Sequence, residues 1–265
     1  MSDAAKPRIV AFANQKGGVG KTTTAVNLAA ALAARHKVLV IDLDPQGNAS
    51  TGLGIDRAQR KPGSYAMLLD GKLPADCIRA TAIPNLSIIP ADPDLAGAEL
   101  ELVDIEGRET RLRQALKGLT GYGWVMLDCP PSLGLLTLNA LVAADSVLVP
   151  LQTEFYALEG VSQITQTIER VKRALNPALE LEGIALTMFD RRNNLAEAVS
   201  ADVRAHFGKA VFDTAIPRNV RVSEAPSHGL PVTVYDFRSP GAQAYVALAA
   251  ELLRRHRQRL KANAG

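Results

Sequence analysis

Cysteine is scarce in this sequence, which holds only Cys77 and Cys129 in 265 residues and has no C-x-x-C spacing. A chain of this length can bury a core that needs no disulfides. The expectation is therefore two unpaired thiols in a reducing cytoplasm. The four histidines form no recognisable nucleophile or metal cluster.

Long hydrophobic runs are also absent. None approaches the roughly 18 residues that a helix needs to cross a bilayer, and no signal peptide precedes the first predicted strand, which begins near Arg8. Hydrophobic residues make up 47% and charged residues 22% of the chain, as in an ordinary soluble domain. We expect a cytoplasmic protein with no membrane partner.

Positive charge exceeds negative charge only slightly, and the formal net charge is +3. This excludes a strongly basic, tail-type nucleic-acid binder. The distribution is uneven, because residues 1–150 hold 15 Lys/Arg and 15 Asp/Glu, whereas the chain from Leu186 onward holds 12 and 7. Such a bias permits a face that binds a polyanion without requiring one.

The most informative stretch is the glycine-rich loop at residues 14–22, Asn-Gln-Lys-Gly-Gly-Val-Gly-Lys-Thr. An apolar run at 9–13 predicts a buried strand before it, and the Ala- and Leu-rich run at 23–35 predicts a helix after it. Strand, glycine loop and helix in this order form a phosphate-binding loop. Lys21 is then expected to reach the β- and γ-phosphates of ATP, and the Thr22 hydroxyl to bind Mg²⁺.

Acidic residues follow two further buried strands, predicted at 37–43 and 124–128. In a parallel sheet the carboxyl ends of the strands meet at one edge, where ligands bind. Asp128 ends its strand, as the magnesium-binding aspartate of a phosphate-loop protein does, and is predicted to hold Mg²⁺ directly or through water. Asp44 is placed to accept a proton or a hydrogen bond from the attacking water, or to cap the following turn.

Continuous apolar strands that alternate with helices indicate an α/β fold, a doubly wound and mostly parallel sheet with helices on both faces. We expect a single phosphate-loop ATPase domain over 1–265, with flexible ends at 1–7 and 262–265. The remaining strands are predicted at 86–90, 146–151 and 183–189, and the remaining helices at 106–119, 133–144, 158–175, from about 195 to 207, and 242–259.

The loop departs from the standard G-x-x-x-x-G-K-[ST] pattern, because Gln15 stands at the first glycine position and Lys16 follows it. In this it resembles the deviant phosphate loop of the ParA/MinD group of ATPases. The resemblance implies that Lys16 contacts phosphate, often that of the partner subunit in a nucleotide-sandwich dimer. It assigns nucleotide binding to Lys16, Gly17, Gly18, Val19, Gly20, Lys21, Thr22 and Thr23.

The same resemblance extends from Arg8 to about Leu253 and assigns further roles. It makes Lys16, Lys21 and Asp44 the catalytic residues, with Asp44 orienting the attacking water. The segment 216–227 is similar to a late family segment in which Pro and Asn lie against adenine, so Pro217 and Asn219 are expected there.

Arginines supply the predicted DNA surface. By resemblance, Arg192 and Arg221 bind DNA nonspecifically, since a guanidinium suits phosphate by charge and by geometry. The weaker candidates are Arg191, Arg218 and Arg238. The basic stretch at 254–261 is either a solvated helix end or an aid to DNA binding. No aromatic residues are interleaved with these arginines, so stacking on single strands is not indicated.

The favoured function is that of a small ParA-type partition ATPase without an N-terminal helix-turn-helix domain. ATP and Mg²⁺ close a homodimer that binds double-stranded DNA on the nucleoid, and a ParB-type protein stimulates hydrolysis and release. One alternative is a MinD-like membrane ATPase, which needs an amphipathic tail with bulky apolar residues. Another is an iron–sulfur carrier or reductase component, which needs cysteines at a dimer axis.

Overall fold

The computed structural model describes residues 6–263 of the chain. Its seven strands form one sheet in the order β3-β4-β2-β5-β1-β6-β7, and only β3 is antiparallel to its neighbour. The strands are β1 (Arg8–Phe12), β2 (Val38–Asp42), β3 (Arg79–Ala80), β4 (Leu86–Ile89), β5 (Trp124–Asp128), β6 (Ser146–Gln152) and β7 (Glu180–Thr187). The predicted doubly wound α/β fold is confirmed.

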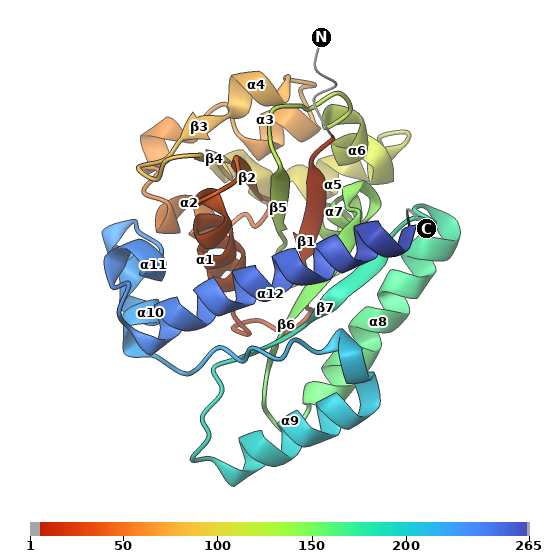
Figure 1. Cartoon of the computed structure of the whole chain (residues 1–265). Coiled ribbons are helices and arrows are strands. Elements are labelled where there is room, and N and C mark those ends of the chain that lie inside the picture. Colours follow the sequence, from red (N-terminus) through yellow and green to blue (C-terminus); the bar gives the residue numbers. More distant parts are fainter. Residues whose placement is uncertain (1–5, 264–265) are drawn as a thin grey trace.

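Helices cover both faces of this sheet (Figure 1). Several of them are only one or two turns long. The helices are α1 (Lys21–Ala33), α2 (Asn48–Gly52), α3 (Ser64–Leu68), α4 (Pro74–Cys77), α5 (Ala98–Leu102), α6 (Arg111–Ala115), α7 (Leu135–Ala143), α8 (Ala157–Ala174), α9 (Asn194–Phe207), α10 (Val220–Glu224), α11 (Val232–Tyr235) and α12 (Pro240–Asn263).

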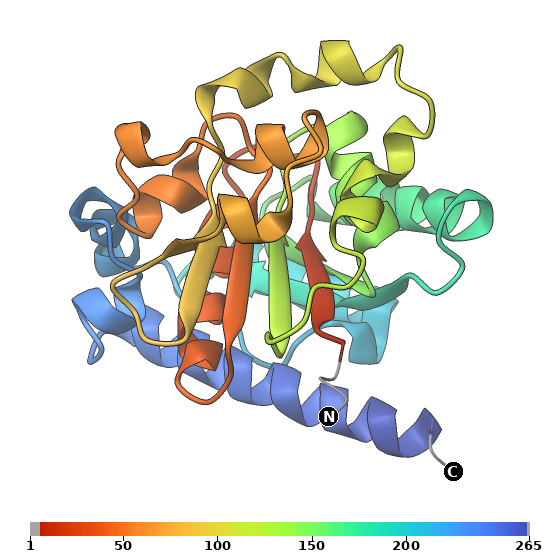
Figure 2. The same ribbon diagram turned by 90° about the horizontal axis from the view of Figure 1, so that it is seen from above.

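Two hydrophobic cores lie on opposite faces of the sheet, beneath the helices that flank it in the view from above (Figure 2). One core packs α1 and α12 against Val10, Val40 and Met126. The other packs α6, α7, α8 and α9 against the alternate side chains of the same strands, such as Ile41 and Leu127. The central strands are buried on both faces, which is why they read as continuous apolar runs.

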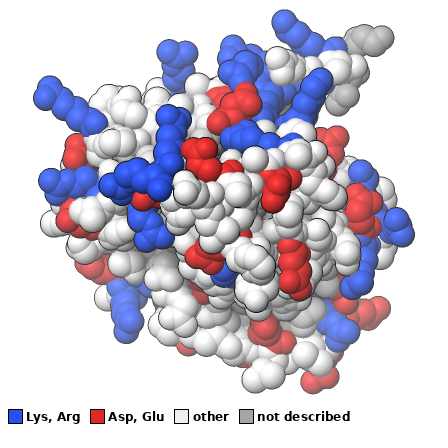
Figure 3. Space-filling view, turned by 90° about the horizontal axis from the view of Figure 1, so that it is seen from below, with Lys and Arg blue, Asp and Glu red and all other residues white. Residues whose placement is uncertain are grey.

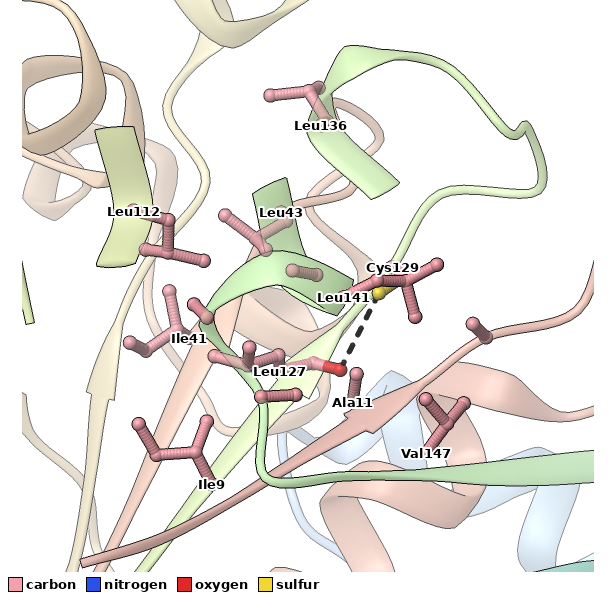
Figure 4. Packing of buried hydrophobic residues seen from close by; sticks show 14 of the residues in the cluster. Ile9, Ala11, Ile41, Leu43, Leu112, Leu127, Cys129, Leu136, Leu141 and Val147 are labelled. Carbon is pink, nitrogen blue, oxygen red and sulfur yellow. Dashed lines mark hydrogen bonds between the residues drawn. The ribbon is translucent and has the colours of Figure 1, made fainter. Parts of the chain in front are cut away.

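Cys129 belongs to the second of these cores and is fully buried among Leu127, Ala11 and Leu141 (Figure 4). Its thiol donates a weak hydrogen bond to the Leu127 carbonyl at 3.8 Å, and burial raises the pKa of the thiol. Cys77 is also fully buried, in a different segment. Neither thiol lies at a surface where a cluster between two subunits would form.

One predicted helix, at 106–119, is wrong in extent. The structure has a 3₁₀ turn followed by the short helix α6, and Gly107 and Gly118 adopt positive φ values of 68° and 86° at either side. Tertiary contacts replace helical hydrogen bonds here, because Asn139 of α7 accepts from the Leu112 amide at 3.0 Å. The segment is pinned to α7 rather than left as a surface helix.

The other predicted helices and strands agree with the structure within a few residues at each end. Sequence patterns did not indicate β3, α3, α4, α5, α10 or α11, each of five residues or fewer. The prediction of flexible ends falls partly on residues 1–5 and 264–265, which lie outside the described residues. Of the rest, Pro7 is buried and Ala262 belongs to α12.

Candidate functional site

The glycine-rich loop connects β1 to α1 at the carboxyl edge of the sheet. Gly18 and Gly20 adopt φ values of 76° and 86°, a left-handed conformation that L side chains rarely adopt, and Gly20 caps α1. The first turn of α1 holds no acidic residue. The amide groups and the positive dipole end of α1 border an open cavity of about 420 Å³. Because no acidic side chain offsets this positive end, the cavity suits an anion.

Lys21 lies at the bottom of this loop and is only 6% exposed. Its ammonium donates to the Lys16 carbonyl at 3.0 Å. Burial lowers the pKa of Lys21, and the nearby Asp128 offsets part of that shift. A phosphate would supply the negative charge that this buried cation lacks.

Lys16 behaves differently, because half of its side chain is exposed. Its backbone amide donates to the Asn14 side chain at 3.0 Å, and the Asn14 amide donates to the Pro150 carbonyl at 2.8 Å. Its ammonium pairs with Glu154, which follows β6. The structure thus places Lys16 at the outer rim of the loop, where it can exchange its partner.

The acidic residue that ends β2 and the one two positions later have separate environments. Asp42 is fully buried and accepts from the Ser50 amide at 2.8 Å and the Ser50 hydroxyl at 2.7 Å. Burial nevertheless raises the pKa of Asp42 to about 6. Asp44 lines the cavity, and its carboxylate accepts from the Gln46 amide at 3.0 Å. Asp42 therefore holds the turn in place, and Asp44 faces the cavity.

Asp128, at the end of β5, pairs in register with Asp42 of β2. Both oxygens of its carboxylate are buried, and neither has a hydrogen-bond partner among the described residues. Burial raises the pKa of Asp128 well above its usual range, and the Asp42 carboxyl adds to that shift. The Thr22 side chain offsets part of it.

A buried carboxylate without partners is costly unless it pairs with a cation or binds a metal. The donor set of Asp128 and Thr22, one carboxylate and one hydroxyl oxygen, suits Mg²⁺, which takes most of its remaining ligands from water and phosphate. The residues present therefore fit this ion.

The predicted adenine residues line a second, smaller cavity of about 240 Å³. It contains Pro217 and Asn219, and it shares Gly20, Thr23 and Met188 with the phosphate cavity. The side-chain oxygen of Asn219 is buried without a partner among the described residues. The structure thus brings the late segment 216–227 next to the glycine loop, as expected.

Sequence reasoning missed several residues of the nucleotide cavity. Its apolar wall is formed mainly by side chains from α1 and from the turns around α10 and α11. Its members are Val26, Met188, Ala225, Pro226, Leu230 and Pro231. Only the Ala225-Pro226 pair carried a signal, through the similarity of its segment to the family.

Three of the predicted arginines, Arg191, Arg192 and Arg218, gather around one hollow of about 960 Å³, which we call the arginine hollow. The structure adds Arg204 of α9 to it, which sequence reasoning missed. Lys and Arg side chains are most frequent in the upper half of the face in Figure 3, and acidic side chains lie among them. The upper part of the face drawn in Figure 3 is therefore basic, with acidic side chains among the basic ones.

The arginines differ in their ion pairs. Arg192 is 90% exposed and makes two hydrogen bonds to Asp190, at 3.0 and 2.9 Å, which lower the pKa of that carboxyl to about 2. Arg221 lies outside the hollow, on α10, and pairs with Glu224 at 2.9 Å and Asp236 at 3.4 Å.

The three weaker candidates, Arg191, Arg218 and Arg238, are exposed. Within residues 6–263 none of them pairs with a carboxylate. Arg191 and Arg218 line the hollow, whereas Arg238 precedes α12 and does not.

The fold and the cavity define a nucleotide hydrolase with a phosphate-binding loop. A family model described as an AAA domain matches residues 7–181. The chromosome partitioning protein ParA of Caulobacter vibrioides is 57% identical over 256 residues, which cover 95% of this chain and 96% of that protein. The sporulation initiation inhibitor protein Soj of Bacillus subtilis is 53% identical over 247 residues, covering 92% and 98%.

Among solved structures, a cobyrinic acid a,c-diamide synthase of Mycobacterium smegmatis with a bound ATP analogue and magnesium has a TM-score of 0.83 at 40% identity, and covers 95% of this chain and 96% of that one. The chain belongs to the ParA/Soj family of chromosome-partitioning ATPases. The resemblance seen in the sequence and the assignment as an ATPase are confirmed, and binding of nucleotide and magnesium occurs in the family.

Proposed function

We propose that this protein is an ATP-dependent DNA-partitioning ATPase. In this proposal ATP closes a sandwich dimer that binds duplex DNA without sequence preference. Hydrolysis, stimulated by a ParB-type partner, then releases the dimer, and repeated cycles segregate a chromosome or a plasmid on the nucleoid.

The observation that carries the proposal is the loop that follows β7. Met188 lines the nucleotide cavity, and Asp190, Arg191 and Arg192 line the arginine hollow. The neighbouring segment makes the same connection, because Pro217 lines both the arginine hollow and the small cavity beside the glycine loop. A ligand in the nucleotide cavity therefore touches the backbone segments that carry the arginines, so nucleotide state can influence the DNA surface.

The proposed dimer depends on Lys16. Its pair with Glu154 is half exposed on both sides, and an exposed pair of this kind contributes roughly 0–1 kcal/mol. Exchange of Glu154 for a phosphate of the partner subunit's nucleotide is therefore inexpensive. Lys16→Ala should weaken ATP-dependent dimerisation more than ATP binding by the monomer, and sedimentation with and without ATP measures this. Normal dimerisation of the variant would contradict the role across the interface.

In the proposed reaction, Lys21 and the amides of the glycine loop bind the phosphates, and Thr22 and Asp128 hold Mg²⁺. The bound ion supplies positive charge for the phosphate oxygens. Asp44 faces the same cavity and accepts a hydrogen bond from the attacking water. Pro217 and Asn219, which line the small cavity beside the glycine loop, would contact the adenine base.

A membrane-bound alternative resembling MinD has less support. The face of α12 that carries Tyr245, Ala249 and Leu252 is buried against the core, with at most 5% exposure. It is therefore not available to insert into lipid. Within the described residues, no helix has the length and apolar character to span a membrane.

The test is binding of duplex DNA of arbitrary sequence, compared with binding of vesicles that contain anionic lipid, each with ATP. Nonspecific DNA affinity arises mainly from counterion release, so log K should fall with log salt at a slope of about −0.9 for each phosphate neutralised. Four to six contacts would remove most of the affinity between about 50 and 200 mM salt. ATP-dependent vesicle binding without DNA binding would favour the alternative.

A further inference from the structure

A second hollow, of about 730 Å³, lies between the end of α9, the turn at residues 208–210 and the C-terminal half of α12. It shares Arg204 and Asp213 with the arginine hollow. The two hollows therefore adjoin each other, and we call them together the basic trough. The segment 208–213 follows the outer edge of the sheet, since the Phe212 amide donates to the Ile184 carbonyl of β7 at 2.9 Å.

The floor of the second hollow is fixed by Arg255 of α12. Its guanidinium donates to the carbonyls of Lys209 at 3.0 Å and Val211 at 2.7 Å, and it pairs with the buried Glu251 at 2.7 Å. It also lies 4.2 Å from the centre of the Phe212 ring. Arg255 is 16% exposed, so it has a structural role and is not free to bind an external anion.

Arg259 fixes the end of α12 in the same way. It pairs with the buried Glu182 of β7 at 2.6 Å, and Arg8 of β1 pairs with the other oxygen of that carboxylate at 2.9 Å. Because α12 is tied to two strands, the cations on its outer surface keep their positions relative to the sheet.

The rim of the second hollow differs from its floor. Lys209 is exposed and has no ion pair within residues 6–263. Arg254 is 56% exposed, and its carboxylate partner Asp213 lies 3.7 Å away and is itself 81% exposed. Arg204 donates to the Asp213 backbone carbonyl at 3.3 Å. The other N–H groups of its guanidinium can bind an anion.

We propose that Lys209, Arg254 and Arg204 form a second contact site for the backbone of the duplex that the arginine hollow binds. The inference rests on the proposed function and extends its DNA surface along the side of β7 toward the end of α12. Two exposed cations, Lys209 and Arg254, together with the half-buried Arg204 over a rigid floor, suit a polymer with regularly spaced phosphates. No exposed aromatic or bulky apolar side chain lines the second hollow, which is unlike a lipid-binding face.

The test compares the double variant Lys209→Glu/Arg254→Glu with Arg57→Glu/Lys72→Glu. The control pair makes the same change in net charge at exposed positions in the 3₁₀ turn Arg57–Gln59 and just before α4. DNA affinity is measured with ATP over a range of salt, after sedimentation has shown that both variants form dimers. We expect the trough variant to reduce the salt slope by about 2 per protomer and the control to leave it unchanged.

A second variant, expected to bind DNA more tightly, distinguishes a lost contact from a folding defect. Asp213→Asn removes the acidic group that competes for Arg254, so it should raise DNA affinity a few-fold at about 50 mM salt. An equal slope in the trough and control variants, or no gain from Asp213→Asn, would overturn the inference alone. A wild-type protein that does not bind duplex DNA would overturn the proposed function as well.

Vesicles that contain phosphatidylserine test, with the same variants, whether the second hollow binds the phosphate of lipid headgroups instead of that of DNA. Retained DNA binding together with lost vesicle binding in Lys209→Glu/Arg254→Glu would assign the second hollow to lipid and contradict the DNA proposal.

Discussion

In and beside the nucleotide cavity the titratable side chains are buried before any ligand arrives, whereas around the arginine hollow the arginines are largely exposed to solvent. Asp128 is fully buried without a partner among the described residues, and Lys21 is 6% exposed. Arg192 is 90% exposed and already paired with Asp190. An unsatisfied buried charge costs several kcal/mol, while a surface ion pair contributes roughly 0–1 kcal/mol.

This contrast separates two kinds of binding site. The nucleotide cavity is shaped in advance and gains its missing charge partners only from nucleotide and metal. Arg192 and Arg221 can exchange a carboxylate for a phosphate because their ion pairs are open to solvent, and Arg191 and Arg218 have no carboxylate pair to exchange within residues 6–263. Changes in the cavity should therefore have large effects on hydrolysis, and single changes around the hollow should have graded effects on DNA affinity.

The largest effect is expected for Lys21→Ala, which removes the buried cation of the cavity. ATP hydrolysis should fall by about 10²–10³-fold or more, as when a preorganised electrostatic contact is lost. Phosphate release measures this, and Lys72→Ala, at an exposed position between α3 and α4, is the control. Turnover at the wild-type level would remove the glycine loop from the mechanism.

Asp44→Ala comes next, because it removes the group assigned to the attacking water and leaves the phosphate contacts in place. Hydrolysis should fall by roughly 10²-fold or more, while ATP binding and dimerisation persist. The variant should accumulate on DNA as an ATP-bound dimer. Asp70→Ala, which changes an exposed aspartate, is the control, and normal turnover in Asp44→Ala would exclude Asp44 from catalysis.

A smaller, graded effect is expected for Arg192→Glu combined with Arg221→Glu. Each lost phosphate contact should lower DNA affinity roughly tenfold at about 50 mM salt, since the slope is about −0.9 per contact. ATP-dependent dimerisation serves as the control measurement. If affinity and slope stay unchanged, the contacts belong instead to the unpaired Arg191 and Arg218.

The smallest expected effect is on the stability of the metal-free protein. A change that abolishes hydrolysis should here increase stability. Both Asp42 and Asp128 have pKa values raised by burial, so the folded, metal-free protein holds protons that the unfolded chain releases. The contribution of these two carboxyls to stability should therefore fall as the pH rises from about 4 through about 6, and further toward the pKa of Asp128.

Asp128→Asn replaces one of these buried carboxyls with a neutral amide of the same shape. We expect it to stabilise the metal-free protein near neutral pH by on the order of 1 kcal/mol and to abolish magnesium-dependent hydrolysis. Chemical denaturation at pH 5 and pH 8, without nucleotide or metal, measures the first effect. A variant less stable than wild type at pH 8 would contradict the view that Asp128 is unsatisfied before the ion binds.

The sequence predicted the two regions to different degrees. The sheet strands and the glycine loop could be predicted, because runs buried on both faces and the Gly-Lys-Thr spacing leave direct patterns. Asp128 and Asp44 could be placed, because the carboxyl ends of parallel strands meet at one edge. The apolar wall of the cavity could not, since Val26 and Leu230 reach it through tertiary packing and carry no local signal.

The arginine surface shows the same limit. The sequence could propose Arg192 and Arg221, but it could not show that both are paired with acidic neighbours, or that Arg204 joins the hollow. Ion pairing depends on side-chain directions across loops, and no residue spacing encodes those. The short helices near residues 64–77 and 220–235 escaped prediction because four- or five-residue helices are held by their surroundings rather than by propensity.

Whether nucleotide controls DNA binding is measured with wild-type protein and a random-sequence duplex, with ATP, with ADP and without nucleotide, over a range of salt. We expect tight binding with ATP only, with an affinity that falls steeply as salt rises. Equal affinity in all three nucleotide states would contradict it, because the nucleotide cavity and the arginines would then act independently.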